Sequence, residues 1–341
     1  MDRRSLLVGL IAALMLAVSG GASAQDLTYG SPELSEAAKK EGKMTLYVAN
    51  FLEPEQAVAK AFNKRFPFVR VEIVRAPGGQ LITRVRTEAA AGRLIADVVD
   101  HSDRTHMAAM NDMFQPYAPP NADQYPVEVR ASDRIWPRSG IAWTIAYNTA
   151  LVPNPPTAWK DLVDPAYGKL GLGQTIAISG GAPWTRAMFE RQVLGEDYWA
   201  KQAALKPQLY PSQAPMVDAM IRGEIALAPL VTSLAVPKVS EGAPIKWIFA
   251  SEGTPVTLFA AGIPNTAPNP NAARLFMNWS LSREGQEVYV EQGSFTGMRN
   301  GPLPPGVDWA SLKTWLPDMG EFERLHKPWI EDWNRIYNYR Q

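Results

Sequence analysis

The sequence predicts an α/β protein with two lobes, each with its own sheet, that are joined by two crossing strands. Apolar strand-type runs alternate with amphipathic helical runs between residues 44 and 103, and again between residues 171 and 250. Two unusually long β-type runs, residues 141–147 and 254–260, are each followed by a proline-rich stretch. A chain that crosses from one domain to another and back is expected to show this pattern.

The first set has the order strand, helix, strand, helix, strand, which is typical of a parallel sheet with right-handed crossovers. The strand-type runs are continuously apolar or alternate with polar residues, and the helical runs show one apolar stripe. Pro54 stands at the first position of one helix and Gly92 follows the end of the other, where these residues are favoured. The five segments are residues 44–49, 54–66, 69–73, 81–91 and 96–99.

Ligands of a parallel sheet bind beyond the carboxyl ends of its strands. None of these ends carries the Gly-x-Gly-x-x-Gly or Gly-Lys-Ser/Thr pattern that cradles phosphates, so the sequence does not support a nucleotide site. The candidate ligand-binding residues at the strand ends of the first set are Asn50, Phe51, Gly78, Gly79, His101 and Ser102.

The other elements follow from the same signals. A short first helix is expected after Ser31, because this N-cap residue precedes a proline and an acidic first turn. The tail is rich in aromatic residues and is expected to be helical. The further segments are a helix near 106–113, a turn-rich surface passage at 116–126, strands near 171–178, 225–230 and 247–250, helices at 271–281 and 282–291, and the tail from 312.

The first 24 residues are expected to form a signal peptide. Arg3 and Arg4 give a positive start, residues 6–18 form an apolar run, and residues 22–24 supply the small side chains of a cleavage site. The apolar run is too short to span a bilayer, and no later run approaches about 20 apolar residues. The start is loosely similar to a twin-arginine signal, so the general and the twin-arginine export routes both stay open. We expect cleavage after Ala24 and a soluble, exported protein.

The composition excludes several classes of function. The 341 residues include 34 Lys and Arg against 34 Asp and Glu, without a basic block, which argues against nucleic acid as a partner. There is no cysteine, hence no disulfide framework, no thiol nucleophile and no N-terminal cysteine to carry a lipid. A chain of this length usually makes two domains of ~150 residues each. We expect a monomer that is free in the exported compartment.

Short motifs spread over residues 40–300 occur in an order that resembles a known family. Behind an export signal, the ordered set is similar to bacterial family 1 extracellular solute-binding proteins of ABC transporters. The resembled branch includes binders of ferric iron, thiamine, phosphonates and sugar phosphates. The motifs are Glu41-Gly42-Lys43, Ala61-Phe62-Asn63-Lys64-Arg65-Phe66-Pro67 with Val69-Arg70-Val71-Glu72, residues 88–92 with Ala96-Asp97-Val98, Arg222-Gly223-Glu224-Ile225-Ala226, Glu252-Gly253-Thr254-Pro255, Pro268-Asn269-Pro270-Asn271-Ala272-Ala273, and Ser282-Arg283-Glu284-Gly285-Gln286.

The resemblance implies a type II periplasmic-binding fold, in which two Rossmann-like α/β lobes joined by two crossing hinge strands close around one ligand. It also implies a periplasmic location and delivery of a small-molecule ligand to an inner-membrane ABC permease, without a cofactor. The expected parts are a signal peptide at 1–24, lobe 1 at 40–140 plus 262–305, lobe 2 at 145–255, and a C-terminal helical tail at 306–341 that packs on the body.

The second set supplies further candidates for the ligand site. Ser179, Gly180 and Gly181 follow a predicted strand and offer a hydroxyl and backbone N–H groups to an organic anion or a polar organic ligand. Iron binders of the resembled branch carry adjacent tyrosines after the strand that follows the Gly-Glu motif. Here Thr232 and Ser233 stand at that place. Their hydroxyls ionise too reluctantly to replace phenolates, which favours an organic ligand over direct ferric-iron binding.

Three larger side chains are also candidates for ligand contact. Arg138 precedes the first crossing strand, where it either clamps a carboxylate or phosphate or forms an ion pair. Trp143 and Trp184 either stack on a ligand or pack in the core, as most of the 11 tryptophans are expected to do.

No metal site and no catalytic site is predicted. His101 and His106 have acidic neighbours, but their spacing lies outside the usual pairs of metal ligands on a helix. Ser179 lacks the Gly-x-Ser-x-Gly context of a nucleophile, and His326, in the tail, is a poor candidate for its general base. Nothing assembles a nucleophile, a base and an orienting group.

The function that the sequence favours is a non-enzymatic solute receptor for an ABC importer, with a small and anionic organic ligand. One alternative is a ferric-iron binder of the same family. Another is an exported α/β hydrolase or lyase, which needs a nucleophile or metal that the sequence does not show. A third is a ligand sensor that passes its closed state to a membrane partner.

Overall fold

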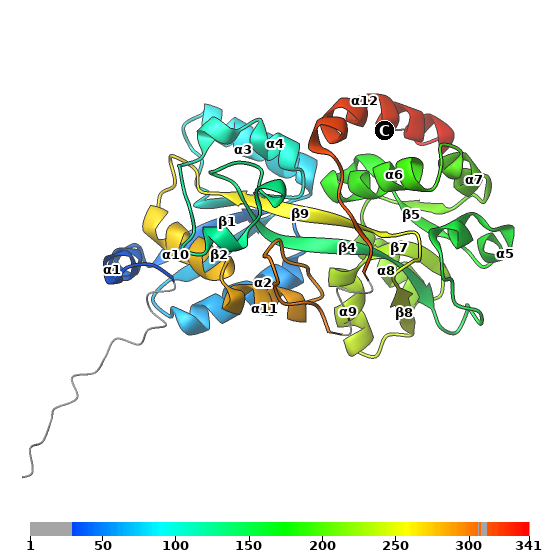
Figure 1. The fold of residues 1–341 in the computed structure, drawn as a ribbon, viewed down its shortest axis with the longest axis horizontal. Coiled ribbons are helices and arrows are strands. Elements are labelled where there is room, and N and C mark those ends of the chain that lie inside the picture. Colours follow the sequence, from blue (N-terminus) through cyan, green and yellow to red (C-terminus); the bar gives the residue numbers. More distant parts are fainter. Residues whose placement is uncertain (1–28, 306, 308–311, 341) are drawn as a thin grey trace, which may run out of the picture.

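The computed structural model describes residues 29–305, 307 and 312–340, and shows two α/β halves side by side with long strands running through both (Figure 1). The predicted signal peptide lies outside the described residues. Within the described ranges, no helix combines the length and the hydrophobicity that crossing a bilayer requires.

The first half has the strand–helix order that the sequence predicts. β1, β2 and β3 are parallel, with β1 in the middle. The side chain of Ser31 caps α1 by accepting a hydrogen bond from the N–H of Leu34, and Gly92 has the positive φ of 63° expected beyond the end of α3. The elements are α1 (Pro32–Glu41), β1 (Lys43–Val48), α2 (Leu52–Arg65), β2 (Arg70–Arg75), α3 (Gly78–Ala90), β3 (Val98–His101) and α4 (Arg104–Ala108).

Two long strands cross the middle of the molecule. β4 (Trp136–Asn148) and β9 (Thr254–Gly262) are antiparallel to each other, and every residue in both is buried. β9 also pairs with β3, and β4 also pairs with β7 (Leu227–Val231). The halves therefore share one sheet with the order β2-β1-β3-β9-β4-β7, which corrects the expectation of two separate sheets. The crossing strands bond to both halves, so the hydrogen-bond ladder does not break between them.

The second half surrounds the other end of this sheet. β8 (Ile245–Ile248) pairs with β4, while β5 (Gly173–Thr175) and β6 (Gln208–Tyr210) form a small parallel sheet. The strand expected to reach Ile178 ends at Thr175, and a 3₁₀ turn then leads to Gly180, whose φ is 150°. The helices are α5 (Pro165–Gly168), α6 (Gly181–Val193), α7 (Tyr198–Ala204), α8 (Gln213–Ile221) and α9 (Thr232–Ser240). Short 3₁₀ turns lie at Asn111–Met113, Ala122–Gln124, Val127–Val129, Trp159–Val163 and Ala177–Ser179.

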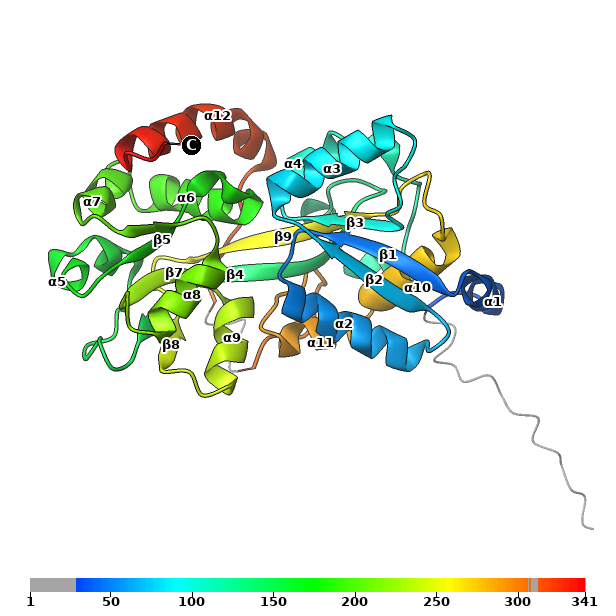
Figure 2. The same cartoon turned by 180° about the vertical axis from the view of Figure 1, so that it is seen from behind.

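After β9 the chain returns to the first half. α10 (Pro270–Ser280) packs on α1, and α11 (Arg283–Glu291) packs on α2. Glu41 at the end of α1 accepts hydrogen bonds from the backbone N–H groups of Asn271 and Ala272, at 3.2 and 2.7 Å, in the first turn of α10. A carboxylate at this position satisfies free N–H groups and complements the helix dipole. The first half is thus built from the elements α1 to α4 and from α10 and α11, which come much later in the chain, as Figure 2 shows from behind.

The aromatic tail forms α12 (Met319–Ile336), which covers α6 and α7 and also touches α4 of the first half (Figure 1). Phe322 accepts a hydrogen bond at its carbonyl from the indole N–H of Trp184, at 3.0 Å. Trp333 is fully buried and stacks on Tyr337 with 4.2 Å between the ring centroids. Before α12, β10 (Thr314–Trp315) pairs with the start of β9. The sequence boundaries proposed for the two lobes and the tail remain predictions.

We expect Trp333→Ala to lower the free energy of unfolding by about 3–5 kcal/mol, because it leaves a large cavity under α12. Lys327→Ala, an exposed position on the same helix, should change it by less than about 0.5 kcal/mol. Urea unfolding followed by tryptophan fluorescence measures both values. Equal, small effects would show that α12 contributes little to the stability of the body.

Candidate functional site

A cleft of about 360 Å³ lies between the two halves. Its lining includes Ile141 of β4 and Phe259 of β9, so the crossing strands contribute to it directly. The remaining lining comes from strand ends and helix starts of both halves, which is where ligands of parallel sheets bind. The lining residues are Ala49, Phe51, Arg75, Pro77, Gly78, Gly79, Gln80, Ser102, Ile141, Ile178, Ser179, Gly180, Ala182, Pro183, Pro211, Ser212, Gln213 and Phe259.

Three helices begin at this cleft without a side-chain cap. They are α3 after Pro77, α6 after Gly180 and α8 after Ser212. The first N–H groups of a helix have no partner inside the helix, and the helix dipole places partial positive charge at that end. All three helices therefore present hydrogen-bond donors to the cleft, an arrangement that favours an anion.

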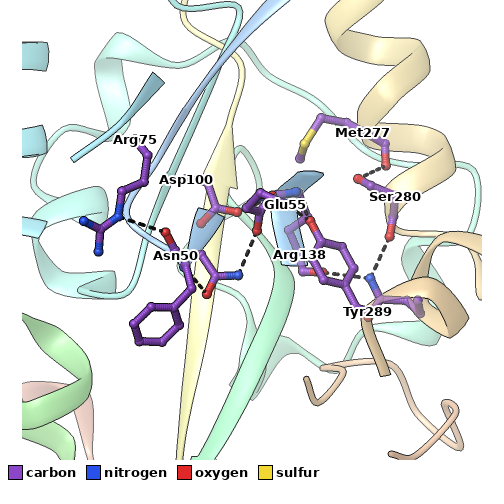
Figure 3. A network of polar contacts seen from close by, with 10 residues as sticks. Asn50, Glu55, Arg75, Asp100, Arg138, Met277, Ser280 and Tyr289 are labelled. Atoms are coloured by element: carbon purple, nitrogen blue, oxygen red, sulfur yellow. Dashed lines mark hydrogen bonds and ion pairs between the residues drawn. The ribbon is translucent and has the colours of Figure 1, made fainter. Parts of the chain in front are cut away.

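Arg75 is the only charged side chain among the described residues that line the cleft. It ends β2, and its Nε donates to the carbonyl of Asn50 at 3.4 Å (Figure 3). Partial burial lowers the pKa of Arg75, against the opposing effect of the nearby Glu53 carboxylate. A guanidinium nevertheless stays protonated in proteins. Together with the helix starts, it makes the cleft electropositive.

Glycines allow the two halves to approach closely beside the cleft. A Cβ on Gly181 would lie 2.6 Å from the carbonyl oxygen of Ser102, across the gap between the halves. A Cβ on Gly78 would lie 2.9 Å from Nε2 of His101 and 3.8 Å from the Cα of Gly180. The contact between the halves therefore needs glycine at position 181, whereas at Gly78 the 3.8 Å approach to Gly180 is ordinary and the short distance is to His101 of the same half.

The structure places six of the sequence candidates in the cleft lining. They come from both halves, and the first three strand ends all contribute to them. They are Phe51, Gly78, Gly79, Ser102, Ser179 and Gly180. Gly181 lies directly behind them, at the contact with Ser102. The other candidates, Asn50, His101, Arg138, Trp143, Trp184, Thr232 and Ser233, are buried outside this lining.

His101 is a support for the cleft wall. Its Nδ1 accepts a hydrogen bond from the N–H of Asp103 at 2.9 Å, which leaves the proton on Nε2. Nε2 can then donate to the carbonyl of Gly78, 2.9 Å away, at the start of α3. Burial lowers the pKa of His101, which favours this neutral form. The side chain thus ties the end of β3 to the first turn of α3.

Arg138 belongs to a buried ion network instead of the cleft. Its Nε donates to Asp100 at 2.5 Å, its Nη2 donates to Glu55 at 2.8 Å, and its Nη1 bonds to the hydroxyl of Tyr289 (Figure 3). The Arg138, Glu55 and Asp100 side chains are fully buried. Of the two hypotheses for Arg138, its geometry matches the ion pair, because its guanidinium bonds to Glu55 and Asp100 and does not line the cleft.

The network extends to the edge of the cleft through Asn50. The amide of Asn50 donates to Glu55 at 2.8 Å, and its side-chain oxygen accepts the N–H of Phe51 at 2.9 Å. The backbone carbonyl of Asn50 accepts a hydrogen bond from Nε of Arg75. Asn50 thus positions two residues of the cleft lining while itself remaining buried.

The remaining candidates outside the lining are buried within the second half. Trp143 is buried in the core of the second half, with the guanidinium of Arg186 5.3 Å from its ring centroid. Trp184 is buried under α12. Thr232 and Ser233 begin α9 and are almost fully buried, outside the cleft lining.

Sequence reasoning missed several lining residues. Arg75 is the last residue of β2, and the sequence signal for the loop begins one residue later, at Ala76. Ser212 and Gln213 were missed because β6 is a three-residue strand that gave no apolar signal. A serine before a helical run is an N-cap signal that could have located them. Ile141 and Phe259 were recognised as strand residues but not as part of the cleft.

The part of the chain with described coordinates contains no group of three or more His, Asp or Glu side chains arranged to bind a metal ion. His106 instead pairs with Asp103, with 3.2 Å between Nδ1 and the carboxylate. The neighbouring Asp103 carboxylate raises the pKa of His106.

The family follows from comparison with known proteins. The model for bacterial extracellular solute-binding proteins matches residues 49–287, which span the cleft and both crossing strands. The chain belongs to this family. Its members are extracellular or periplasmic binding proteins. An uncharacterised protein of Haemophilus influenzae is 25% identical over 326 residues, covering 88% of this chain and 92% of that protein.

Solved structures share the fold of this extracellular solute-binding protein. The periplasmic binding protein AfuA of Actinobacillus pleuropneumoniae, with fructose 6-phosphate bound, has a TM-score of 0.74 at 21% identity, covering 88% of this chain and 100% of that one. Iron-bound HitA of Pseudomonas aeruginosa has a TM-score of 0.70 at 19% identity, covering 86% of this chain and 98% of that one. A periplasmic thiamin-binding protein has a TM-score of 0.70 at 20% identity, covering 86% of this chain and 96% of that one. These likenesses confirm the predicted type II periplasmic-binding fold.

The buried network predicts a pH dependence of stability. Burial raises the pKa of Asp100, Arg138 lowers it and Glu55 raises it, and the net effect is a pKa of about 7. Asp100 therefore keeps its proton to a higher pH in the folded state than in the unfolded state, where the pKa of Asp is near 3.9. This contribution to stability is present below about pH 4 and is lost as the pH rises through about 7. We expect the free energy of unfolding to fall between about pH 5 and pH 8, and Asp100→Asn to flatten that fall.

Urea titrations at several pH values measure this slope. Asp112→Asn, which removes an exposed carboxyl, should leave the slope as it is in the wild type. An unchanged slope in Asp100→Asn would show that Asp100 is already ionised at acidic pH.

Gly181→Ala should oppose the closed arrangement, because its Cβ would clash with the carbonyl of Ser102. Forcing a group into a packed contact costs about 1–3 kcal/mol, so ligand affinity should fall about 5- to 150-fold. Titration calorimetry gives the affinity, and small-angle scattering at saturating ligand should give a larger radius of gyration. Gly320→Ala, in the first turn of α12, is the matched control and should bind like the wild type. Wild-type affinity in Gly181→Ala would show that closure does not need this contact.

Proposed function

We propose that the protein is a periplasmic receptor for a small organic anion, which it captures in the cleft between its halves and delivers to an inner-membrane ABC permease. It acts as a monomer after removal of the signal peptide behind Ala24, needs no cofactor, and has no nucleic-acid partner. The observation that carries the proposal is the convergence of Arg75 and three uncapped helix starts on one cleft.

The cleft favours an anion for a simple electrostatic reason. Its only charged side chain in the described lining is a cation, and the helix starts of α3, α6 and α8 add N–H donors and partial positive charge. Asp and Glu are absent from the same lining. A negative group can therefore be paired and hydrogen-bonded at once, and charge-assisted hydrogen bonds are the stronger kind.

Closure of the halves around the ligand follows from where the cleft lies. Its walls belong to different halves, and Ile141 and Phe259 belong to the two strands that connect them. Bending of these strands opens or closes the cleft, a motion in which few residues absorb the change. A bound anion stabilises the closed form because only that form brings the donors of both halves to it.

The alternatives fit the cleft less well. Ferric iron prefers hard anionic oxygen ligands, and the described lining contains no Tyr, Asp, Glu or His. A hydrolase needs a nucleophile beside a base, whereas Ser102, Ser179 and Ser212 have no histidine or carboxylate in this lining. A sensor would use the same binding step, and its membrane partner would distinguish it from a transport receptor.

Arg75→Gln should weaken binding of the anion about 10- to 150-fold, the loss expected for one charge-assisted hydrogen bond. The ligand for this test is the organic acid that most raises the melting temperature in a screen of carboxylates, phosphonates and phosphate esters. Arg93→Gln, which removes an exposed positive charge beyond the far end of α3, is the control. Calorimetry measures both variants. Equal affinities for the two would contradict a direct role of Arg75, and turnover of the bound acid would favour an enzyme.

A further inference from the structure

The cleft is lined by polar side chains and by a larger number of apolar residues. Its polar side chains are Arg75, Gln80, Ser102, Ser179, Ser212 and Gln213. The apolar lining contains two aromatic rings, two isoleucines and several alanines and prolines. These residues are Ala49, Phe51, Pro77, Ile141, Ile178, Ala182, Pro183, Pro211 and Phe259.

The polar part offers more donors than acceptors to a ligand. Gln213 is 3% exposed, and its Oε1 already accepts the N–H of Val231 at 2.8 Å, which leaves its Nε2 donor for the cleft that it lines. Ser179 donates its hydroxyl proton to the carbonyl of Ile176 at 2.9 Å, so its hydroxyl can only accept a hydrogen bond from a ligand. The helix starts add only donors. Carboxylate side chains, which accept hydrogen bonds from hydroxyl groups of a ligand, do not occur in the described lining, and the amide of Gln80 offers one acceptor beside its donors.

This imbalance suits some anions and not others. A sugar phosphate carries several hydroxyl groups, each of which needs an acceptor as well as a donor once it is buried. A hydroxyl group against Phe259 or Ile141 would lose its hydrogen bonds to water without replacement, since these side chains are apolar. An apolar body against the same surface would gain free energy in proportion to the area buried.

The apolar part reaches across the gap between the halves. Phe51 follows β1 in the first half, yet it packs on the hydrophobic core of the second half. Ile178 lies on the opposite wall and is only half-buried, so it has surface left to cover. A cleft of about 360 Å³ is near the lower end of the usual range of about 300–1,000 Å³ for small-molecule sites. The body must therefore be small.

We infer that the cleft selects small organic acids with an apolar, hydroxyl-poor body, such as aryl or short alkyl carboxylates, phosphonates or phosphate monoesters. This inference rests on the proposed function and adds the class of ligand. The acid group binds at Arg75 and the helix starts of α3, α6 and α8. The body lies against Phe51, Ile141, Ile178 and Phe259.

A matched panel of ligands separates the two parts of the recognition. Phenyl phosphate and glucose 6-phosphate share the head group and differ in the body, while benzoate and benzamide share the body and differ in charge. Calorimetry on the wild-type protein should show phenyl phosphate binding about 10-fold or more tightly than glucose 6-phosphate, and benzoate about 10-fold or more tightly than benzamide.

A variant pair tests where the body lies. Ile178→Ser should weaken phenyl phosphate about 10-fold and change glucose 6-phosphate less than about 3-fold. Ile95→Ser, at an exposed isoleucine outside the cleft lining, is the control and should bind both as the wild type does. The melting temperature of each free variant shows whether it is folded.

Each outcome has a distinct meaning. Glucose 6-phosphate binding as tightly as phenyl phosphate would overturn the apolar body and leave the anion receptor intact. Benzamide binding as tightly as benzoate would overturn the anionic ligand, and with it the proposed function. No binding of phenyl phosphate or benzoate to folded protein would overturn the inference for acids of this size. An equal loss of affinity for phenyl phosphate and glucose 6-phosphate in Ile178→Ser would show that the apolar body of the ligand does not lie against Ile178.

Discussion

The antiparallel pairing of β4 with β9 is the interaction on which the rest of the structure depends. It joins the two halves into one sheet, because β9 continues into the pairing with β3 and β4 into the pairing with β7. It also sets where a ligand can bind, since Ile141 and Phe259 from these strands line the cleft. The same two strands connect the halves both covalently and through hydrogen bonds, and they are the strands that bend in the proposed opening of the cleft.

Much of the fold could be predicted because its signals are local. The alternation of strands and helices, the cap at Ser31 and the two long apolar runs each lie within a short stretch. The continuous sheet could not, because strand pairing joins residues such as Val99 and Gly262 that are far apart in the chain. β6 was missed because its three residues are only partly buried and carry no periodic pattern.

For the site too, local sequence signals predicted the positions of the loops, and contacts between distant residues were not predicted. The rule that ligands bind at strand ends located the loops after β1, β2 and β3, which all reach the cleft. It could not tell which side chain of a loop faces the ligand. Arg138 looked like an anion clamp, yet Glu55 and Asp100, 83 and 38 residues away in the sequence, neutralise it in the core. Arg75 lies at the end of a more exposed strand, beside Glu53 and the carbonyl of Asn50, and is the cation that lines the cleft.

The capping of α10 by Glu41 has a consequence for how this chain folds. The two partners are 230 residues apart, and α10 and α11 complete the core on which α1 and α2 pack. Contacts between residues this far apart in the sequence form late, because closing the intervening loop costs entropy before the contact contributes any favourable free energy. The amino-terminal half therefore has to wait for residues made near the end of synthesis. A nascent chain that has only reached β7 still exposes the apolar faces of α1 and α2.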